Sequence, residues 1–60
     1  MIMSETDRLQ ELLLGMDVPA SRRSDLNWLA RNLGVRNRGH SNFGEAEKLI
    51  KILRKREEVK

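Results

Sequence analysis

Few side chains in this sequence could perform covalent chemistry. His40 and Ser41 are neighbours, but adjacency along the chain does not direct an imidazole base onto a hydroxyl nucleophile. The sequence has no cysteine and one histidine, so we predict neither a thiolate nucleophile nor a metal site. A chain of 60 residues is also too short to enclose a large substrate pocket. We therefore predict that the protein is not an enzyme and has no catalytic residues, cofactor or metal.

Binding chemistry is better represented, because 12 lysines and arginines stand against 9 aspartates and glutamates, a formal net charge of +3. The excess is uneven: residues 21–44 contain five arginines and one aspartate, whereas residues 1–20 are acidic. The basic part of the chain could face a polyanion. Alternatively, the acidic first segment pairs with the rest of the chain inside one fold.

The segment 34–42 is predicted to be a nine-residue loop of small, polar and basic side chains. Arginines close to free loop amides and a helix N-terminus suit a phosphate or a carboxylate. The alternative is a solvated connection whose asparagine, serine and glycine residues serve turn geometry. The candidate ligands in this loop are Arg36, Arg38, His40 and Asn42.

Two further groups of cations could bind an anionic partner. Arg22 and Arg23 lie near the start of the second predicted helix, where the helix dipole disfavours cations. Either a bound anion or salt bridges to the acidic first helix would explain them. Lys48, Lys51 and Lys55 recur on one face of the third predicted helix. Such a row could contact phosphates, or it could be a solvated face.

Trp28 is a candidate interface residue, because it points away from the apolar stripe of its predicted helix. An exposed tryptophan is a preferred anchor at protein interfaces, and Arg31 could stack on its ring. The alternative, which we favour, is that Trp28 is partly buried in the bundle.

The elements that position these residues are three amphipathic helices, predicted at about 4–14, 19–33 and 43–57. We expect a small all-α three-helix bundle that forms a single domain over residues 1–60, with frayed ends at 1–3 and 56–60. The residues expected in the core recur at helical spacing: Leu9, Leu12, Leu13, Met16, Leu26, Leu29, Ala30, Leu33, Phe43, Ala46, Leu49, Ile50 and Leu53.

Local signals set the expected helix ends. Ser4 can cap the first helix, and Gly15 is a natural left-handed stop for it. Pro19 fits the first position of the second helix, and Gly34 is expected to end that helix with a contact from Val35.

The third helix also has start and pairing signals. Asn42 is expected to cap it, with Glu45 at the capping-box position. Glu47 and Lys51 form a favourable pair one turn apart.

The string Leu29-Ala30-Arg31-Asn32-Leu33-Gly34-Val35 resembles the first helix and turn of helix-turn-helix DNA-binding domains. The resemblance implies a turn at Gly34, and a following helix whose N-terminal side chains reach the major groove. The sequence departs from the family pattern after Val35, because His40 stands where an apolar residue is expected and the next apolar residue is Phe43.

The leading hypothesis is therefore a nucleic-acid-binding regulator of helix-turn-helix type or a variant of it. Duplex DNA is favoured, because the basic face lacks the aromatic side chains that stack single strands. The alternative is a protein-interaction module, such as a small phage- or plasmid-type inhibitor or adaptor. It would bind an acidic protein through Trp28 and the basic loop.

The sequence also gives expectations about location. The N-terminus has no basic start and no apolar run typical of a secretory signal. The longest apolar run, Leu12–Leu14, is far below the ~20 residues of a membrane span. We expect a cytoplasmic protein without membrane contact, and the small core leaves a homodimer open.

Overall fold

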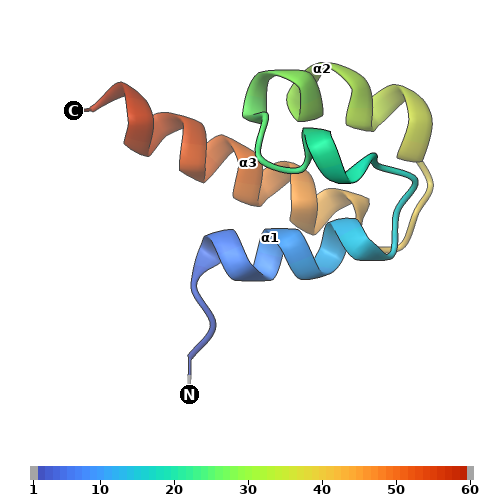
Figure 1. The fold of residues 1–60 in the computed structure, drawn as a ribbon, viewed down its shortest axis with the longest axis horizontal. Coiled ribbons are helices and arrows are strands. Elements are labelled where there is room, and N and C mark those ends of the chain that lie inside the picture. Colours follow the sequence, from blue (N-terminus) through green and yellow to red (C-terminus); the bar gives the residue numbers. More distant parts are fainter. Residues whose placement is uncertain (1, 60) are drawn as a thin grey trace.

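The computed structural model describes residues 2–59, which fold into three α-helices and one short 3₁₀-helix with no strand (Figure 1). The elements are α1 (Glu5–Leu14), η1 (Ala20–Arg22), α2 (Leu26–Asn37) and α3 (Phe43–Glu58). The predicted all-α three-helix bundle is therefore confirmed. Residues 1 and 60, which belong to the ends predicted to fray, lie outside the described residues.

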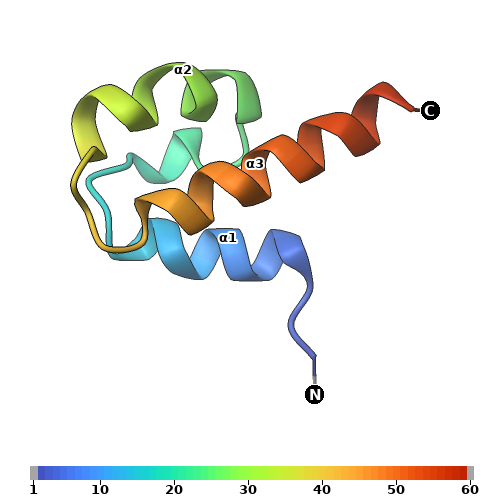
Figure 2. The same ribbon diagram turned by 180° about the vertical axis from the view of Figure 1, so that it is seen from behind.

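The bundle is organised around α3. α3 runs back along both α1 and α2 in the opposite direction, as both views show (Figures 1 and 2). α1 and α2 each pack against α3, but no Cα atom of α1 comes within 8 Å of one in α2. The short helix η1 lies in the space between them (Figure 1) and packs against α2. The close backbone contacts are therefore those of α1 with α3 and of α2 with α3, while Leu13 of α1 and Leu29 of α2 belong to the same buried core.

Most of the predicted core is buried. The largest fully buried side chains are Leu9, Leu13, Leu29, Leu33 and Ile50. Leu26, Phe43 and Leu53 are half-buried against that core. Ala30 is exposed, contrary to prediction, because it lines an open groove between α2 and α3. Val18 is also buried. It lies between α1 and η1, outside any helix, so helical periodicity could not predict its burial.

α1 begins as predicted, and its end differs. The Ser4 hydroxyl accepts a hydrogen bond from the Asp7 backbone N–H at 3.1 Å. Gly15 follows the last helical residue with φ −87°, so the predicted left-handed stop is wrong. Its N–H instead bonds the Leu12 carbonyl at 3.1 Å, which tightens the last turn.

The second helix is shifted along the sequence relative to the prediction. Pro19 precedes η1 rather than α2, and the side chain of Asp25 caps α2 by accepting from the Trp28 N–H at 3.0 Å. α2 then continues through Gly34 to Asn37. Val35 is 84% exposed, so the predicted glycine stop with its valine contact is wrong. A glycine within a helix costs about 1 kcal/mol, and a stable tertiary interface can outweigh that cost.

The connection between α2 and α3 is accordingly residues 38–42, shorter than the predicted loop of residues 34–42. Gly39 has φ +96°, a left-handed conformation that glycine adopts without steric cost. The string that resembles a helix-turn-helix lies entirely inside α2, so the expected turn at Gly34 is absent. α2 and α3 run in opposite directions in Figure 1.

α3 is the longest element and keeps its helical geometry to Glu58. Residues 56–58 are therefore helical, where fraying was predicted. Asn42 occupies the N-cap position without a side-chain cap bond. The predicted capping box is absent, because the carboxylate of Glu45 is engaged by Arg8 at 2.8 Å. The predicted Glu47–Lys51 pair is present at 3.6 Å.

None of the helices within residues 2–59 is both long enough and apolar enough to cross a membrane.

Candidate anion-binding surface and groove

The charges that face α1 are largely paired. Arg8 donates to both carboxylate oxygens of Glu45, with Nε to Oε1 at 2.8 Å and Nη2 to Oε2 at 3.2 Å. Arg56 pairs with Glu5. Two ion pairs therefore join α1 to α3, and in one of them, Glu5–Arg56, an acidic residue of the first segment pairs with the rest of the fold.

The Arg8–Glu45 pair shifts both groups. The hydrogen bond from Arg8 lowers the pKa of the Glu45 carboxyl below its ordinary value, and the same bond raises the pKa of Arg8. Both side chains remain solvent-accessible, so water screens this attraction.

The charges of α2, its following loop and α3 are arranged differently. Most cations there lie more than 4 Å from any carboxylate of the described residues. The exceptions are Lys51, which pairs with Glu47, and Arg56, which pairs with Glu5. We refer to the exposed cations of these elements that have no such partner as the α2–α3 basic surface, a set defined by its residues and not by a single face: Arg31, Arg36, Arg38, Lys48, Arg54 and Lys55. All of them are exposed, so their charges are available to an external anion.

The predicted lysine row is a feature of this surface. Lys48, Lys51 and Lys55 are exposed on α3, on the side opposite its buried Ala46 and Leu49. From Lys48 to Lys55 the helix rises about 10 Å. Duplex DNA carries one phosphate per about 1.7 Å of axis, so the row spans several phosphates.

The loop residues divide into two pairs. Arg36 and Arg38 are exposed, as predicted for ligands of an anion. His40 is half-buried, and its Nε2 lies 2.6 Å from the Gly15 carbonyl. Its Nδ1 accepts a long hydrogen bond from the Asn42 N–H at 3.5 Å, which requires the proton on Nε2. The ring therefore ties the loop to the end of α1.

His40 and Asn42 therefore bond within the chain in this structure, and their contact with an anionic ligand stays a prediction. Asn42 is half-buried, and its N–H is the group that bonds the His40 ring.

Arg22 and Arg23 do not join the α2–α3 basic surface. Arg22 pairs with Asp25 at 3.5 Å, and its guanidinium carbon lies 5.9 Å from the centroid of the Trp28 ring. The predicted stacking partner, Arg31, is therefore not the one observed. Trp28 is half-buried against the core, as favoured.

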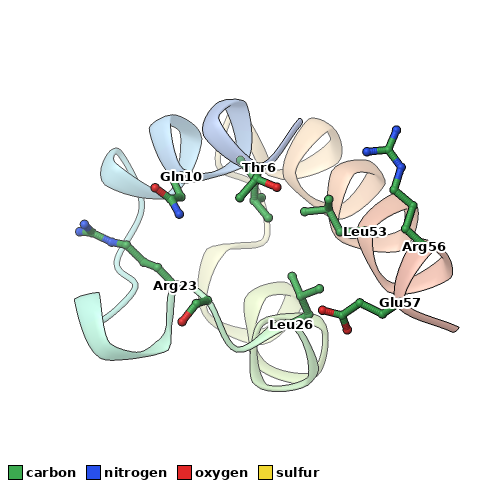
Figure 3. A pocket seen from close by; sticks show the side chains of 9 residues that line it. Thr6, Gln10, Arg23, Leu26, Leu53, Arg56 and Glu57 are labelled. Carbon is green, nitrogen blue, oxygen red and sulfur yellow. The ribbon is translucent and has the colours of Figure 1, made fainter. Parts of the chain in front are cut away.

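A groove lies beside Arg23, between the first half of α1, the start of α2 and the last turns of α3 (Figure 3). Its volume is about 350 Å³, larger than we expected of so short a chain. Leu9, Leu26 and Leu53 supply its apolar lining, and the remaining lining residues are polar or charged. The groove is open to solvent, and its lining residues include neither a histidine nor a cysteine.

A second groove of about 300 Å³ separates α2 from α3. Leu33, Phe43 and Ile50 form its floor, and Lys51 and Arg54 lie along its rim. It therefore belongs to the α2–α3 basic surface. No group of three or more metal-ligating side chains gathers anywhere in residues 2–59.

Sequence reasoning missed two residues. Asn37 is 6% exposed, and its Oδ1 accepts from the Asp17 N–H at 3.1 Å. No sequence signal distinguishes it from the solvated loop asparagines. Arg54 lies at the rim of the second groove, three residues after Lys51 and on the flank of α3 nearest α2. Helical periodicity from Phe43 and Ile50 could have placed it there.

Comparison of this chain with protein-family models, curated proteins and solved structures finds no match. Its function must be inferred from the geometry and charges of its own residues.

Proposed function

We propose that this protein binds duplex nucleic acid through the α2–α3 basic surface, by contacts to the phosphate backbone. The observation that carries the proposal is the separation of its charges. Arg8 and Arg56, which join α1 to α3, are paired with carboxylates, whereas six cations of α2, its loop and α3 are exposed and have no carboxylate partner within residues 2–59. Exposed lysines and arginines gain affinity for a polyanion by releasing its counterions.

A duplex is favoured over a single strand. Single-strand binding draws on aromatic side chains that stack on bases, but Trp28 and Phe43 are both half-buried against the core. Backbone contacts that position a protein carry no sequence information themselves. The proposed binding therefore needs no recognition helix, and the antiparallel arrangement of α2 and α3 is no obstacle to it.

The alternative, an acidic protein partner anchored by Trp28, has less support. Trp28 packs on the core and lies beneath Arg22, so its truncation would remove packing inside this chain as well as any contact with a partner.

Titration of a labelled DNA duplex at two or more salt concentrations tests the proposal. The double variant Lys48→Ala/Lys55→Ala should flatten the slope of log K against log salt by about one to two units, because each phosphate contact contributes about 0.9. Arg36→Ala/Arg38→Ala should act similarly. The matched control is Ile2→Glu/Met3→Glu, which removes the same net charge at two exposed residues before α1.

The control should leave the slope close to that of the unmodified protein. If the duplex is not bound even at low salt, the proposal is wrong. If the control flattens the slope as much as the lysine variant does, the protein's overall charge rather than this surface is responsible.

A further inference from the structure

The side of α1 that faces away from the core carries acidic side chains. Asp7, Glu11 and Leu14 are exposed, on the side of the helix opposite its buried leucines. α1 lies at one edge of the bundle in both views (Figures 1 and 2). We call these three residues the α1 outer face, and no other element within residues 2–59 covers it.

The lysine row of α3 is a face of the opposite charge. Lys48, Lys51 and Lys55 are exposed and likewise lie opposite the buried side of their helix. Since both faces point away from the core that α1 and α3 share, they are turned outward on two different helices. No ion pair joins them within residues 2–59. The two faces can therefore meet only between two molecules.

The charges of both faces are available to another molecule. Asp7 and Lys55 form no ion pair within residues 2–59. Glu11 and Lys51 each pair with a residue one turn earlier on their own helix, at 3.3 Å and 3.6 Å, and their side chains are 50% and 74% exposed. Exposed pairs of this kind contribute little to stability, so they leave both charges free to pair with a second molecule.

The charges on the two faces have the same spacing. Asp7 and Glu11 are four residues apart, and so are Lys51 and Lys55, which corresponds to about 6 Å along a helix axis. An antiparallel alignment of the two helices that sets Asp7 against Lys55 therefore also sets Glu11 against Lys51.

The same alignment matches the exposed apolar residue of α1. Leu14, which is 64% exposed, then lies opposite Lys48, whose methylene stem can cover a leucine while its ammonium group stays in water. A parallel alignment would also pair the four charges, but it would bring the carboxylate of Glu58 against Leu14. The antiparallel alignment is therefore the better fit.

We infer that copies of this chain associate head to tail, with the α1 outer face of one copy lying antiparallel on the lysine row of the next. Because the two faces differ and each copy has one of each, the association extends beyond a dimer or closes into a ring. A contact between two short helix faces buries little surface, so it belongs to the weak, transient class of interfaces. The inference does not depend on the binding of nucleic acid.

Sedimentation equilibrium of the purified protein, without nucleic acid, tests the inference. The apparent mass of the unmodified protein should rise with its concentration. Asp7→Lys/Glu11→Lys and Lys51→Glu/Lys55→Glu should each lower the association constant by about two- to thirtyfold, the range for losing two exposed ion pairs. Combining all four substitutions keeps the net charge at +3 and should restore the association, because the same pairs form with reversed signs.

The matched control is Arg36→Glu/Arg38→Glu, which changes the net charge as much as the lysine variant does, at exposed residues outside the two faces. It should self-associate like the unmodified protein. The inference is overturned if the unmodified protein stays monomeric at every concentration reached. It is also overturned if the four-site variant associates as weakly as the two-site variants, or if the control loses as much association as the lysine variant.

NMR spectra of the isotope-labelled protein locate the contact. On dilution the amide resonances of residues 7–14 and 48–55 should shift, while those of α2 and η1 should not. Shifts confined to α2 or η1 would place the contact on another face and overturn the inference.

Discussion

The two ends of the space between α1 and α2 differ. At the end near Gly15, which we call the closed end, side chains of this chain fill the space. At the other end, which we call the open end, the groove beside Arg23 remains. Met16 and Val18 are buried at the closed end, where Asn37 and His40 bond the backbone that follows α1. At the open end Leu26 and Leu53 are half-buried. The bundle therefore has a fully packed core at the closed end and a partly exposed apolar surface at the open end.

The difference follows from how the connections are built. The segment between α1 and α2 leaves α1 at Gly15 and enters the core through Met16 and Val18. Both side chains are buried in the core at that end. Within residues 2–59 no comparable segment lies over Leu53, and the final turns of α3 extend past α2 (Figure 1). An unfilled helix–helix interface results.

The largest effect should come from truncating an apolar side chain at the closed end. Met16→Ala should lower the free energy of unfolding by about 2–5 kcal/mol, the usual cost of a cavity at a buried site. Leu26→Ala, at the open end, should cost about half as much, because its side chain is only half-buried. Chemical denaturation measures both. Equal losses of unfolding free energy would mean that Leu26 is as fully buried in solution as Met16.

The next effect concerns the buried amide at the closed end. Asn37→Ala should cost about 1–3 kcal/mol, because it leaves the Asp17 N–H without its acceptor. Asn27→Ala is the matched control, since Asn27 is exposed on the same helix. It should change stability by less than about 0.5 kcal/mol. Similar losses of unfolding free energy for the two variants would show that the hydrogen bond between Asn37 and Asp17 does not stabilise the closed end.

A smaller effect is expected at His40. His40→Ala removes the bond to the Gly15 carbonyl and should cost about 1 kcal/mol. Ser41→Ala, at the exposed neighbouring position, should be close to neutral. Amide hydrogen exchange should also accelerate in residues 38–42 of the His40 variant, because the loop is no longer tied to α1. If amide exchange in residues 38–42 is unchanged, the hydrogen bond between His40 and Gly15 does not restrain the loop.

The smallest effect concerns the ion pair between Arg8 and Glu45. The pKa of Glu45 is lowered in the folded state, so its contribution to stability is present above the pKa of the unfolded chain. It is lost as the pH falls through the folded-state pKa. The Tm difference between the unmodified protein and Glu45→Gln should therefore shrink as the solution is acidified. Glu58→Gln removes an exposed carboxylate that has no ion pair within residues 2–59, and it should show no such trend.

Much of this architecture was predictable from residue spacing alone. The recurrence of Leu9, Leu12 and Leu13, and of Leu29 and Leu33, identified buried helix faces, because helical periodicity places such residues on one side. The hydroxyl of Ser4 identified the start of α1, since a cap is a local interaction between residues three apart.

The boundaries of α2 were not predictable in the same way. Gly34 is a common stop signal, but α2 continues through it to Asn37. The reason is tertiary: the packing of Leu33 and Asn37 favours the longer helix, and the next break comes where Gly39 takes a positive φ. Both Pro19 and Asp25 are typical of a helix start. In the structure Pro19 precedes η1 and Asp25 caps α2, and only the tertiary structure shows that residues 20–22 form a separate short helix.

The candidate site was foreseen only in part. Arg36, Arg38 and the lysine row were predicted as exposed cations and are exposed. Arg22, His40 and Asn42 were predicted as ligands, but in the structure they bond within the chain. Their type and loop position are compatible with either role. The choice depends on which groups the fold brings within hydrogen-bond distance.

The sequence by itself determined the helical class, the apolar faces and the excess of positive charge, because these follow from residue type and from spacings within one helix. Only the tertiary structure decided which cations remain unpaired and where α3 is left uncovered. Ion pairs such as Arg8–Glu45 join residues 37 positions apart, and no local pattern encodes such a distance. The basic surface and the groove are therefore properties of how the three helices pack.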